Sequence, residues 1–290
     1  MWRKVLVLEW RIIRRDTSAK ATLILFAFFL ALAGLAGGRY ADQMSDGLKR
    51  LEQNEASRRS EVKKSLEILT SQGANNQSKD PRDPVWMGKE GIAPLLVFPP
   101  APLAPVAVGQ RDLQPQALRV NTEIHLSAER ETETAMSGPT RLMTGAFDLA
   151  FLFVVLFPLM VITLSYELLS GERERGTLAM LLAQPITLRT LVLGKAAARA
   201  LGLSAVTIAF VLCGLVVAGV NLSNLDAWGP TGLLLLLVVA WAFFWFAAAV
   251  LVNAFSQSSA TNALLLVGTW LVLVIVVPGL VHVSADVLHP

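Results

Sequence analysis

Apolar residues in this chain gather in long runs, without the alternation of strands or the narrow stripe of surface helices. A helix needs about 20 apolar residues to cross a bilayer, because lipid offers no hydrogen-bond partner to exposed backbone. Runs close to or above this length occupy residues 21–38, 146–166, 196–220, 231–255 and 263–283. They predict an all-α polytopic membrane protein with at least five transmembrane helices.

The polar residues between these runs define the predicted domain organisation. Residues 39–145 form a large insert after the first span, and residues 146–283 contain the other four spans with a loop at 167–195. Residues 284–290 form a short tail. Because an odd number of spans is unusual for this kind of protein, we expect a further segment with a sixth span beyond the tail.

The insert contains three kinds of sequence. Residues 42–70 are highly charged with apolar residues at near-helical spacing, and they predict a helix that continues from the first span. Between Pro81 and Pro115 there are eight prolines, which predict extended chain because proline disrupts a helix interior. Residues 116–137 are predicted to return as a helix, so the insert is predicted to be partly helical.

Residues 1–20 precede the first span and are amphipathic between residues 2 and 15. Large apolar residues cover one side of a helical wheel, while bases that include Arg11, Arg14 and Arg15 cover the other. This pattern predicts an interfacial helix with its bases toward anionic lipid. Glu9 falls on the apolar side, where it is either paired or lifted toward water. A signal peptide is the alternative, but the stretch is long for a charged n-region.

Charge is distributed as membrane topology requires. The chain is 54% apolar with a net charge of +3, and the insert holds 14 Lys or Arg against 14 Asp or Glu. Such a balance argues against nucleic acid as a partner. Residues 1–20 carry six bases and the 167–195 loop four, whereas residues 221–230 carry none. The positive-inside rule therefore predicts a cytoplasmic N-terminus and an extracytoplasmic insert. The 256–262 loop would be cytoplasmic although it lacks bases.

The 167–195 loop carries the most distinctive motif. Its residues are the charged set Glu172, Arg173, Glu174 and Arg175, followed by Gly176, Thr177, Leu178, Leu181 and Pro185. Thr177 can cap a short helix, which Pro185 then ends. No internal use for these charges is visible in the sequence, so we expect the helix to display them to the cytosol for docking by another protein.

Neither a catalytic site nor a metal site is visible in the sequence. Gly171 to Gly176 imitates a phosphate-binding loop, but Thr177 replaces the required lysine and the glutamates would repel phosphate. The three histidines lack metal-ligand spacing, and Cys213 is expected to be a packing residue. We therefore expect this chain to bind no cofactor, so that any ATP chemistry belongs to a partner chain.

Small and acidic residues in the spans are candidates for packing and function. Rows of small residues, which allow close helix contact in lipid, are Gly194, Ala198 and Gly202 in one span and Gly34 and Gly38 in another. Asp148 lies near the outer end of the second span. Acidic residues within membranes are functional candidates, but so close to the interface we expect a hydrated side chain.

These segments resemble the ABC-2-type transporter permeases. The residues that carry the resemblance are Tyr166-Glu167, Ser170 to Leu178, Leu181-Leu182, Gln184-Pro185, and Lys195 with Arg199. They are similar to the cytoplasmic signature of that family, and Glu9 to Asp16 is similar to its N-terminal elbow. The long insert resembles that of a subgroup with large extracytoplasmic domains. The resemblance covers residues 1–38 and 146–283.

The resemblance implies a non-catalytic permease subunit in a bacterial inner membrane. It implies that residues 170–185 form a coupling helix in a groove of a separate ABC ATPase, which binds ATP and Mg²⁺. Two permeases, identical or paralogous, would assemble with two ATPases, and six spans per permease is the family norm. Residues 39–145 are the candidate contact for a periplasmic partner.

Other function classes stay open at this point. A membrane scaffold or receptor would use the insert to bind a protein, but it has no need of the motif in the 167–185 loop. An intramembrane enzyme is poorly supported, because no span holds a convergent catalytic set. The apolar spans suit export of a lipid, hydrophobic peptide or drug, and equally the mechanical transmission of ATPase movements to the periplasm.

Overall fold

The computed structural model describes residues 16–72, 80–91, 94–108, 117–120, 127–129, 147–168, 170–176, 188–223, 225–256 and 258–288. The chain forms two compact units, one of Met1–Ala36 with Phe147–Pro290 and the other of Gly37–Ala146. The predicted interfacial helix, with Glu9, Arg11, Arg14 and Arg15, lies outside the described residues.

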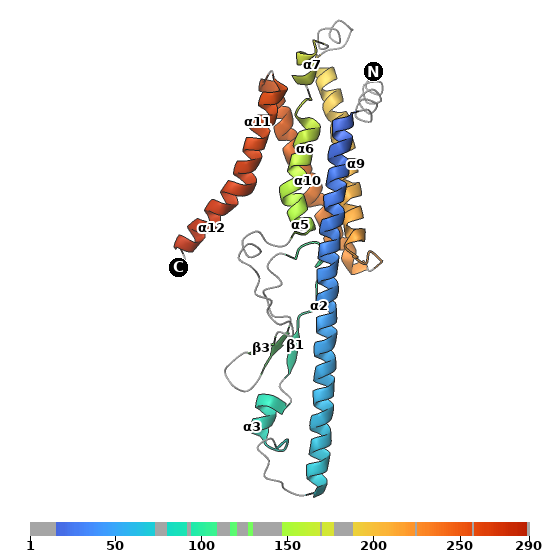
Figure 1. Ribbon diagram of the computed structural model, residues 1–290, viewed down its shortest axis with the longest axis vertical. Coiled ribbons are helices and arrows are strands. Elements are labelled where there is room, and N and C mark those ends of the chain that lie inside the picture. The colour runs from blue at the N-terminus through green and yellow to red at the C-terminus, as the bar shows by residue number, and fades with distance from the viewer. Residues whose placement is uncertain are drawn as a thin grey trace. The chain divides into compact units, whose positions relative to one another are not determined.

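The described helices of the first unit account for the five predicted spans (Figure 1). The spans comprise the start of α2 (Thr17–Gln72); α5 (Leu149–Phe151), η3 (Leu152–Leu156) and α6 (Phe157–Ser165); α9 (Leu188–Val217); η4 (Leu225–Ala227) and α10 (Trp228–Phe255); and α11 (Ser259–Trp270), η5 (Leu271–Val276) and α12 (Val277–Leu288). Each of the five is long and apolar enough to cross a membrane. The prediction of an all-α polytopic membrane protein is confirmed.

Glycines allow α2 to approach α9 closely. A Cβ atom on Gly34 would lie 2.9 Å from Val217 Cγ1, and one on Gly214 would lie 3.3 Å from Leu30 Cδ1. Both distances are shorter than ordinary van der Waals contact, so larger residues would push the helices apart. Gly34 belonged to one predicted small-residue row, whereas its neighbour Gly214 was not singled out.

Aromatic rings join α2 to two further spans. The Phe26 ring centroid lies 5.0 Å from that of Phe210 in α9 and 5.8 Å from that of Phe157 in α6. Tilted ring pairs at this separation contribute more stabilisation than the burial of their apolar area alone. The start of α2 is therefore packed into the first unit by side chains from both of its neighbours.

Two spans contain a π-helical segment just before a proline. η3 precedes Pro158, and η5 precedes Pro278. Proline has no N–H to donate, so the regular helical ladder is disturbed there, and π segments accommodate one extra residue in a helix. Trp270, at the end of α11, donates its indole N–H to the Val155 carbonyl of η3 at 3.0 Å. This bond connects the second and fifth spans.

The fifth span packs least of all. Only 6% of the most apolar stretch of the fifth span is buried. In the second span, within Leu149–Glu174, 50% of the corresponding stretch is buried. Figure 1 shows α12 leaning away from the other helices of its unit. Leu264 and Leu280 are 75% and 63% exposed, as expected of a surface that faces lipid or another chain in the membrane.

The second unit combines the rest of α2 with short elements of the insert. These are α3 (Pro84–Trp86), η1 (Met87–Gly91), and an antiparallel sheet in the order β1 (Leu95–Val97), β2 (Ala117–Arg119) and β3 (Ser127–Glu129). Leu95 pairs with Arg119, and Ala117 pairs with Glu129. Leu48 and Leu51 of α2 form a small core with Ala117.

These elements confirm one prediction for the insert and overturn two. The helix predicted over residues 42–70 is confirmed, since α2 is unbroken from Thr17 to Gln72. The helix predicted over 116–137 is wrong in its described parts, because β2 pairs its backbone with the apolar Leu95–Val97 segment and β3 pairs with β2. The prediction of extended chain fails at residues 84–91, where Asp83 caps a turn that begins with a proline.

One glycine of α2 lets the insert reach the helix backbone. A Cβ atom on Gly37 would lie 1.9 Å from the Pro105 carbonyl oxygen. No side chain fits such a gap, because the obstacle is backbone and not the end of a flexible side chain. The segment around Pro105 therefore crosses α2 at a position that requires glycine.

Candidate functional site

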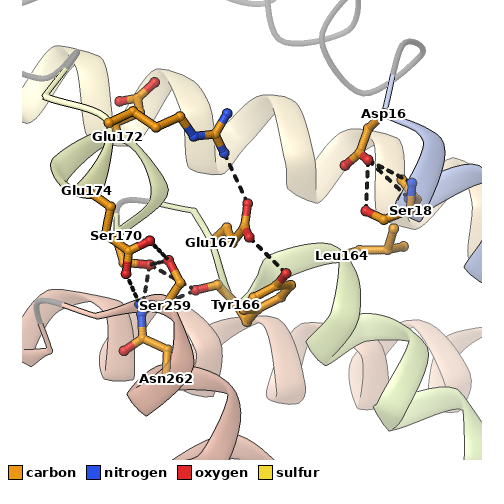
Figure 2. Close-up of polar contacts among 12 residues, drawn as sticks. Asp16, Ser18, Leu164, Tyr166, Glu167, Ser170, Glu172, Glu174, Ser259 and Asn262 are labelled. Carbon is orange, nitrogen blue, oxygen red and sulfur yellow. Dashed lines mark hydrogen bonds and ion pairs between the residues drawn. The ribbon is translucent and has the colours of Figure 1, made fainter.

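Polar residues gather at one end of the first unit, around the short helix α7 (Ser170–Glu174). Figures 1 and 2 show this end, where α6 ends and where α9 and α11 begin. We call α7 and the residues that bond to its side chains the α7 cluster. Its contacts come from α9, α10, α11 and the residues just after α6.

Glu174 caps the first turn of α11. Ser259 donates its backbone N–H to Glu174 Oε1 at 2.7 Å and its hydroxyl to Oε2 at 3.0 Å (Figure 2). Among the described residues, the N-cap Ser258 makes no side-chain cap bond. The carboxylate thus satisfies an N–H that the helix itself leaves open, and its charge complements the positive end of the helix dipole.

Beside this cap, a buried network joins α7 to α10 and α11. Asn262 donates from Nδ2 to Ser170 Oγ at 3.0 Å and to Asn253 Oδ1 at 3.1 Å. Asn253 in turn donates from Nδ2 to the Ala249 carbonyl at 2.8 Å. Ser170, Asn253 and Asn262 are all 0% exposed. Because buried amides need partners, this network favours one relative position of the three helices.

An ion pair joins α7 to α9. The ammonium of Lys195 contacts the carboxylate of Glu172, and the two side chains are 6% and 20% exposed. One turn later, Arg199 donates from Nη1 to the Leu164 carbonyl at the end of α6, at 3.2 Å. Buried cations are costly without a partner, so these contacts hold the start of α9 against α6 and α7.

Arg173 of α7 and Arg175, which follows it, bond to neighbouring loops. Arg173 donates from Nη1 to the Ser256 carbonyl at 3.1 Å, in the connection between α10 and α11. Arg175 donates from Nη2 to Glu167 Oε2 at 3.1 Å, and Tyr166 donates its hydroxyl to Glu167 Oε1 at 2.8 Å. The α10–α11 connection, which carries no base in the sequence, thus receives one from α7.

The structure corrects the expectation that these charges have no internal use. Each of the four charged residues from Glu172 to Arg175 bonds to another part of the chain. Arg173, Glu174 and Arg175 are nevertheless exposed, so they anchor α7 and form a charged surface at once. Gly176 has φ +69°, a left-handed conformation that favours glycine after a helix. Thr177, Leu178, Leu181 and Pro185 lie outside the described residues.

Two aspartates cap helices. Asp16 accepts from the Ser18 backbone N–H at 2.9 Å and hydroxyl at 2.7 Å at the start of α2. Burial alone would raise the pKa of Asp16, but the bonds from Ser18 and Ala19 and the charge of Arg199 lower it below its ordinary value. Asp148, expected to be hydrated, is 3% exposed and accepts from the Phe151 N–H at 2.8 Å. That expectation was wrong because the side chain satisfies the first turn of α5 instead.

Comparison with known proteins places the chain in a family. The model of a family described as "ABC-2 family transporter protein" matches residues 3–289. The chain belongs to the ABC-2 transporter family. It is therefore a permease component of an ABC transporter, a multi-pass membrane component that is not itself catalytic. Membership implies an ABC ATPase as partner and, as a rule, dimerisation. No curated protein matches the chain.

In this permease, the predicted site residues within the described ranges fall into two groups. Glu172 to Gly176 converge with Lys195 in the α7 cluster, whereas the predicted packing row lies along α9. In that row Gly194 and Ala198 are buried and Gly202 is partly exposed. Within the described residues, no group of three or more His, Cys, Asp or Glu side chains is placed to hold a metal ion.

Three residues of the α7 cluster escaped the sequence analysis. Asn253, Ser259 and Asn262 supply three of the four side chains that bond to one another in the buried network with Ser170, yet they stand at the ends of apolar runs and looked like ordinary span boundaries. A signal was present nonetheless, because two asparagines nine positions apart flank a short turn. Polar side chains on adjacent membrane helices commonly bond to each other.

Proposed function

We propose that the permease couples ATP hydrolysis by a separate ABC ATPase to movement of its membrane spans. In this proposal α7 and residues 177–185 form the coupling element that docks on the ATPase. The observation that carries the proposal is that a helix of five residues bonds directly to α9, α10 and α11, and to the Tyr166 carbonyl just after α6. An element attached in this way can pass a displacement to four spans together.

The charged side chains of the motif support docking, because they make internal bonds and are also exposed. Isolated surface charges contribute only about 0–1 kcal/mol each, so the exposed Arg173, Glu174 and Arg175 alone would form a weak contact. In α7 they are held in place by internal bonds, and an ordered charged surface loses less entropy on binding. Leu178 and Leu181, in the sequence that follows, supply the apolar part of the proposed contact.

We further propose that the α7 end faces the cytoplasm of a bacterial inner membrane, with the N-terminus on that side. The start of α2, the end of α6, the start of α9 and the α10–α11 connection share this end through Asp16, Leu164, Arg199 and Arg173. Basic residues concentrate here, as the positive-inside rule requires. Residues 39–145 are then extracytoplasmic, where a periplasmic partner is proposed to bind.

ATP and Mg²⁺ are proposed to bind only to the partner ATPase, and the transporter is proposed to contain two permeases, identical or paralogous. The purified chain alone is expected neither to bind nor to hydrolyse ATP. The apolar spans support export of a lipid, hydrophobic peptide or drug, or mechanical transmission through the insert. We also propose that the chain belongs to the subgroup of the family that has large extracytoplasmic domains.

Copurification from native membranes in mild detergent tests the docking role. The parent should bring down an ABC ATPase, and Leu178→Asp with Leu181→Asp should lose it while still inserting. Leu225→Asp is the control, because Leu225 is 85% exposed and precedes α10, at the end of the span opposite Asn253. Copurification of the ATPase with the Leu178 and Leu181 variant would refute the docking role. Absence of any ABC ATPase from the parent would favour the scaffold alternative.

A further inference from the structure

Two asparagines close the turn between the fourth and fifth spans. Asn253 lies in the last turn of α10 and Asn262 in the first turn of α11, and both are 0% exposed. Burying an amide without partners is costly in proteins, whereas leucine would fit an apolar span at no such cost. The hydrogen bonds of Asn253 and Asn262 therefore serve mainly to select one arrangement of the helices around them, since apolar side chains would bury as well.

That arrangement includes α7. Ser170 of α7 lies 3.0 Å from Asn262 Nδ2 and 2.9 Å from Ser259 Oγ, while Glu174 caps α11 on the other side of the same turn. By contrast, α7 is joined to α9 by the Glu172–Lys195 ion pair. Among the neighbouring helices, α11 has the closest connection to α7. Its first turn is capped by Glu174 and also bonds to Ser170 through the buried network.

The rest of the fifth span has few internal contacts that oppose movement. Trp270 bonds to Val155 at the end of α11, and beyond it η5 and α12 are largely exposed. A helix held at its first turn, at the fully buried Leu266 and at Trp270, and bordered beyond these by fluid lipid or another chain, follows the elements that hold it.

We infer that Asn253 and Asn262 are positioning residues that unite α7 with the α10–α11 connection, so that a displacement of α7 moves the fifth span with it. This rests on the proposed function, in which an ABC ATPase displaces α7. The fifth span, which is the least buried of the five, is then the span that moves furthest relative to the others with each ATP cycle.

Distance measurements in the assembled transporter test this inference. The full chain, with Cys213→Ser, is purified with its ATPase into lipid nanodiscs and spin-labelled at Ser223→Cys and Ser284→Cys. Both sites are exposed. Ser223 follows the third span and Ser284 lies near the end of the fifth, and both spans begin near α7. The distance between the labels should shift between the nucleotide-free and the ATP–vanadate state. An unchanged distance in a complex that hydrolyses ATP would overturn the inference.

The variant Asn253→Leu/Asn262→Leu removes the bonds without leaving an unpaired amide. It should retain insertion and ATPase association, but the distance shift should be lost. Thr261→Val is the matched control, because Thr261 adjoins Asn262 and is exposed, and it should preserve the shift. A double-leucine variant with the full shift would overturn the inference.

A covalent link separates positioning from a purely structural role. Ser170 Oγ and Ser259 Oγ are 2.9 Å apart, close enough for Ser170→Cys/Ser259→Cys to form a disulfide. If α7 and α11 move together, oxidation leaves ATP turnover and the shift intact and restores the shift to the double-leucine variant. Loss of turnover on oxidation would show that the helices must separate, which contradicts the inference.

The two proposals fail in different ways. An ABC ATPase that is missing from the parent complex, or retained by the Leu178 and Leu181 variant, counts against the proposed function. A bound and active ATPase with a shift that ignores Asn253 and Asn262 counts against the positioning role alone.

Discussion

Glu174 caps α11 through Ser259, although the two residues are 85 positions apart in the sequence. A helix usually takes its N-cap from the residue just before it. Here the cap comes from α7, so α11 starts correctly only when α7 is in place. The structure of the α7 end is therefore cooperative, and single substitutions there are expected to affect more than one helix.

Glu174→Ala should loosen the first turn of α11. The Ser259 N–H loses its acceptor, and the amides of residues 259–262 should exchange with deuterium several-fold faster than in the parent. Glu174→Gln keeps an acceptor without the charge and should give an intermediate rate. Glu52→Ala, at an exposed position of α2, is the control. Equal rates in Glu174→Ala and the parent would show that the cap contributes nothing.

Lys195→Met and Glu172→Gln should each destabilise the α7 end, whereas the double variant should cost less than either one alone. Breaking a buried ion pair leaves one charge without its partner, at about 3–5 kcal/mol. Glu172 keeps some contact with water, so smaller losses are expected here. Thermal unfolding in nanodiscs measures the effect, and strictly additive losses would contradict direct coupling.

A charge swap distinguishes the internal role of Glu172 from docking. Glu172→Lys/Lys195→Glu should recover the thermal stability that Glu172→Lys alone loses, because the pair re-forms with opposite polarity. Reversal of Glu172 and Glu174 together would be a poor test of docking, since it breaks contacts with both α9 and α11. A swap as unstable as the single reversal would count against the pair.

Membrane orientation can be read from cysteine labelling in a Cys213→Ser background. Ser71→Cys in α2 should react with an impermeant maleimide added to intact spheroplasts, whereas Arg175→Cys should react only after lysis. Both positions are exposed. Ser170 is unsuitable as an inner marker because it is 0% exposed and would stay unlabelled on either side. The reverse pattern would invert the proposed topology.

Gly37→Ala should displace the segment around Pro105 from α2. The added Cβ would lie 1.9 Å from a backbone oxygen, which no rotamer change can relieve. Deuterium exchange at Ala104 and Val106, whose N–H groups bond within that segment, should accelerate. Gly34→Ala is the matched comparison, because its new Cβ meets the Val217 side chain and should leave this segment unchanged. Equal exchange in Gly37→Ala and the parent would contradict the close approach.

The spans were predictable because membrane crossing imposes a length and a composition that local sequence reveals. The charged motif at Glu172–Arg175 was found in the same way. Its bonds were not, since Lys195 and Ser259 lie 23 and 85 positions from their partners and no periodicity encodes contacts between helices. Strands of three residues, such as Leu95–Val97, are too short to show alternation. The sheet in the insert was therefore missed.

The π segment η5 determines which side of the last helix meets its surroundings. One surplus residue in Leu271–Val276 advances everything after it by about 100° around the helix axis. Deleting a single residue there would restore α-helical geometry and turn α12, while α11, its cap and Trp270 stayed as they are. The number of residues in η5 thus determines which side chains of α12 face the surroundings of this span.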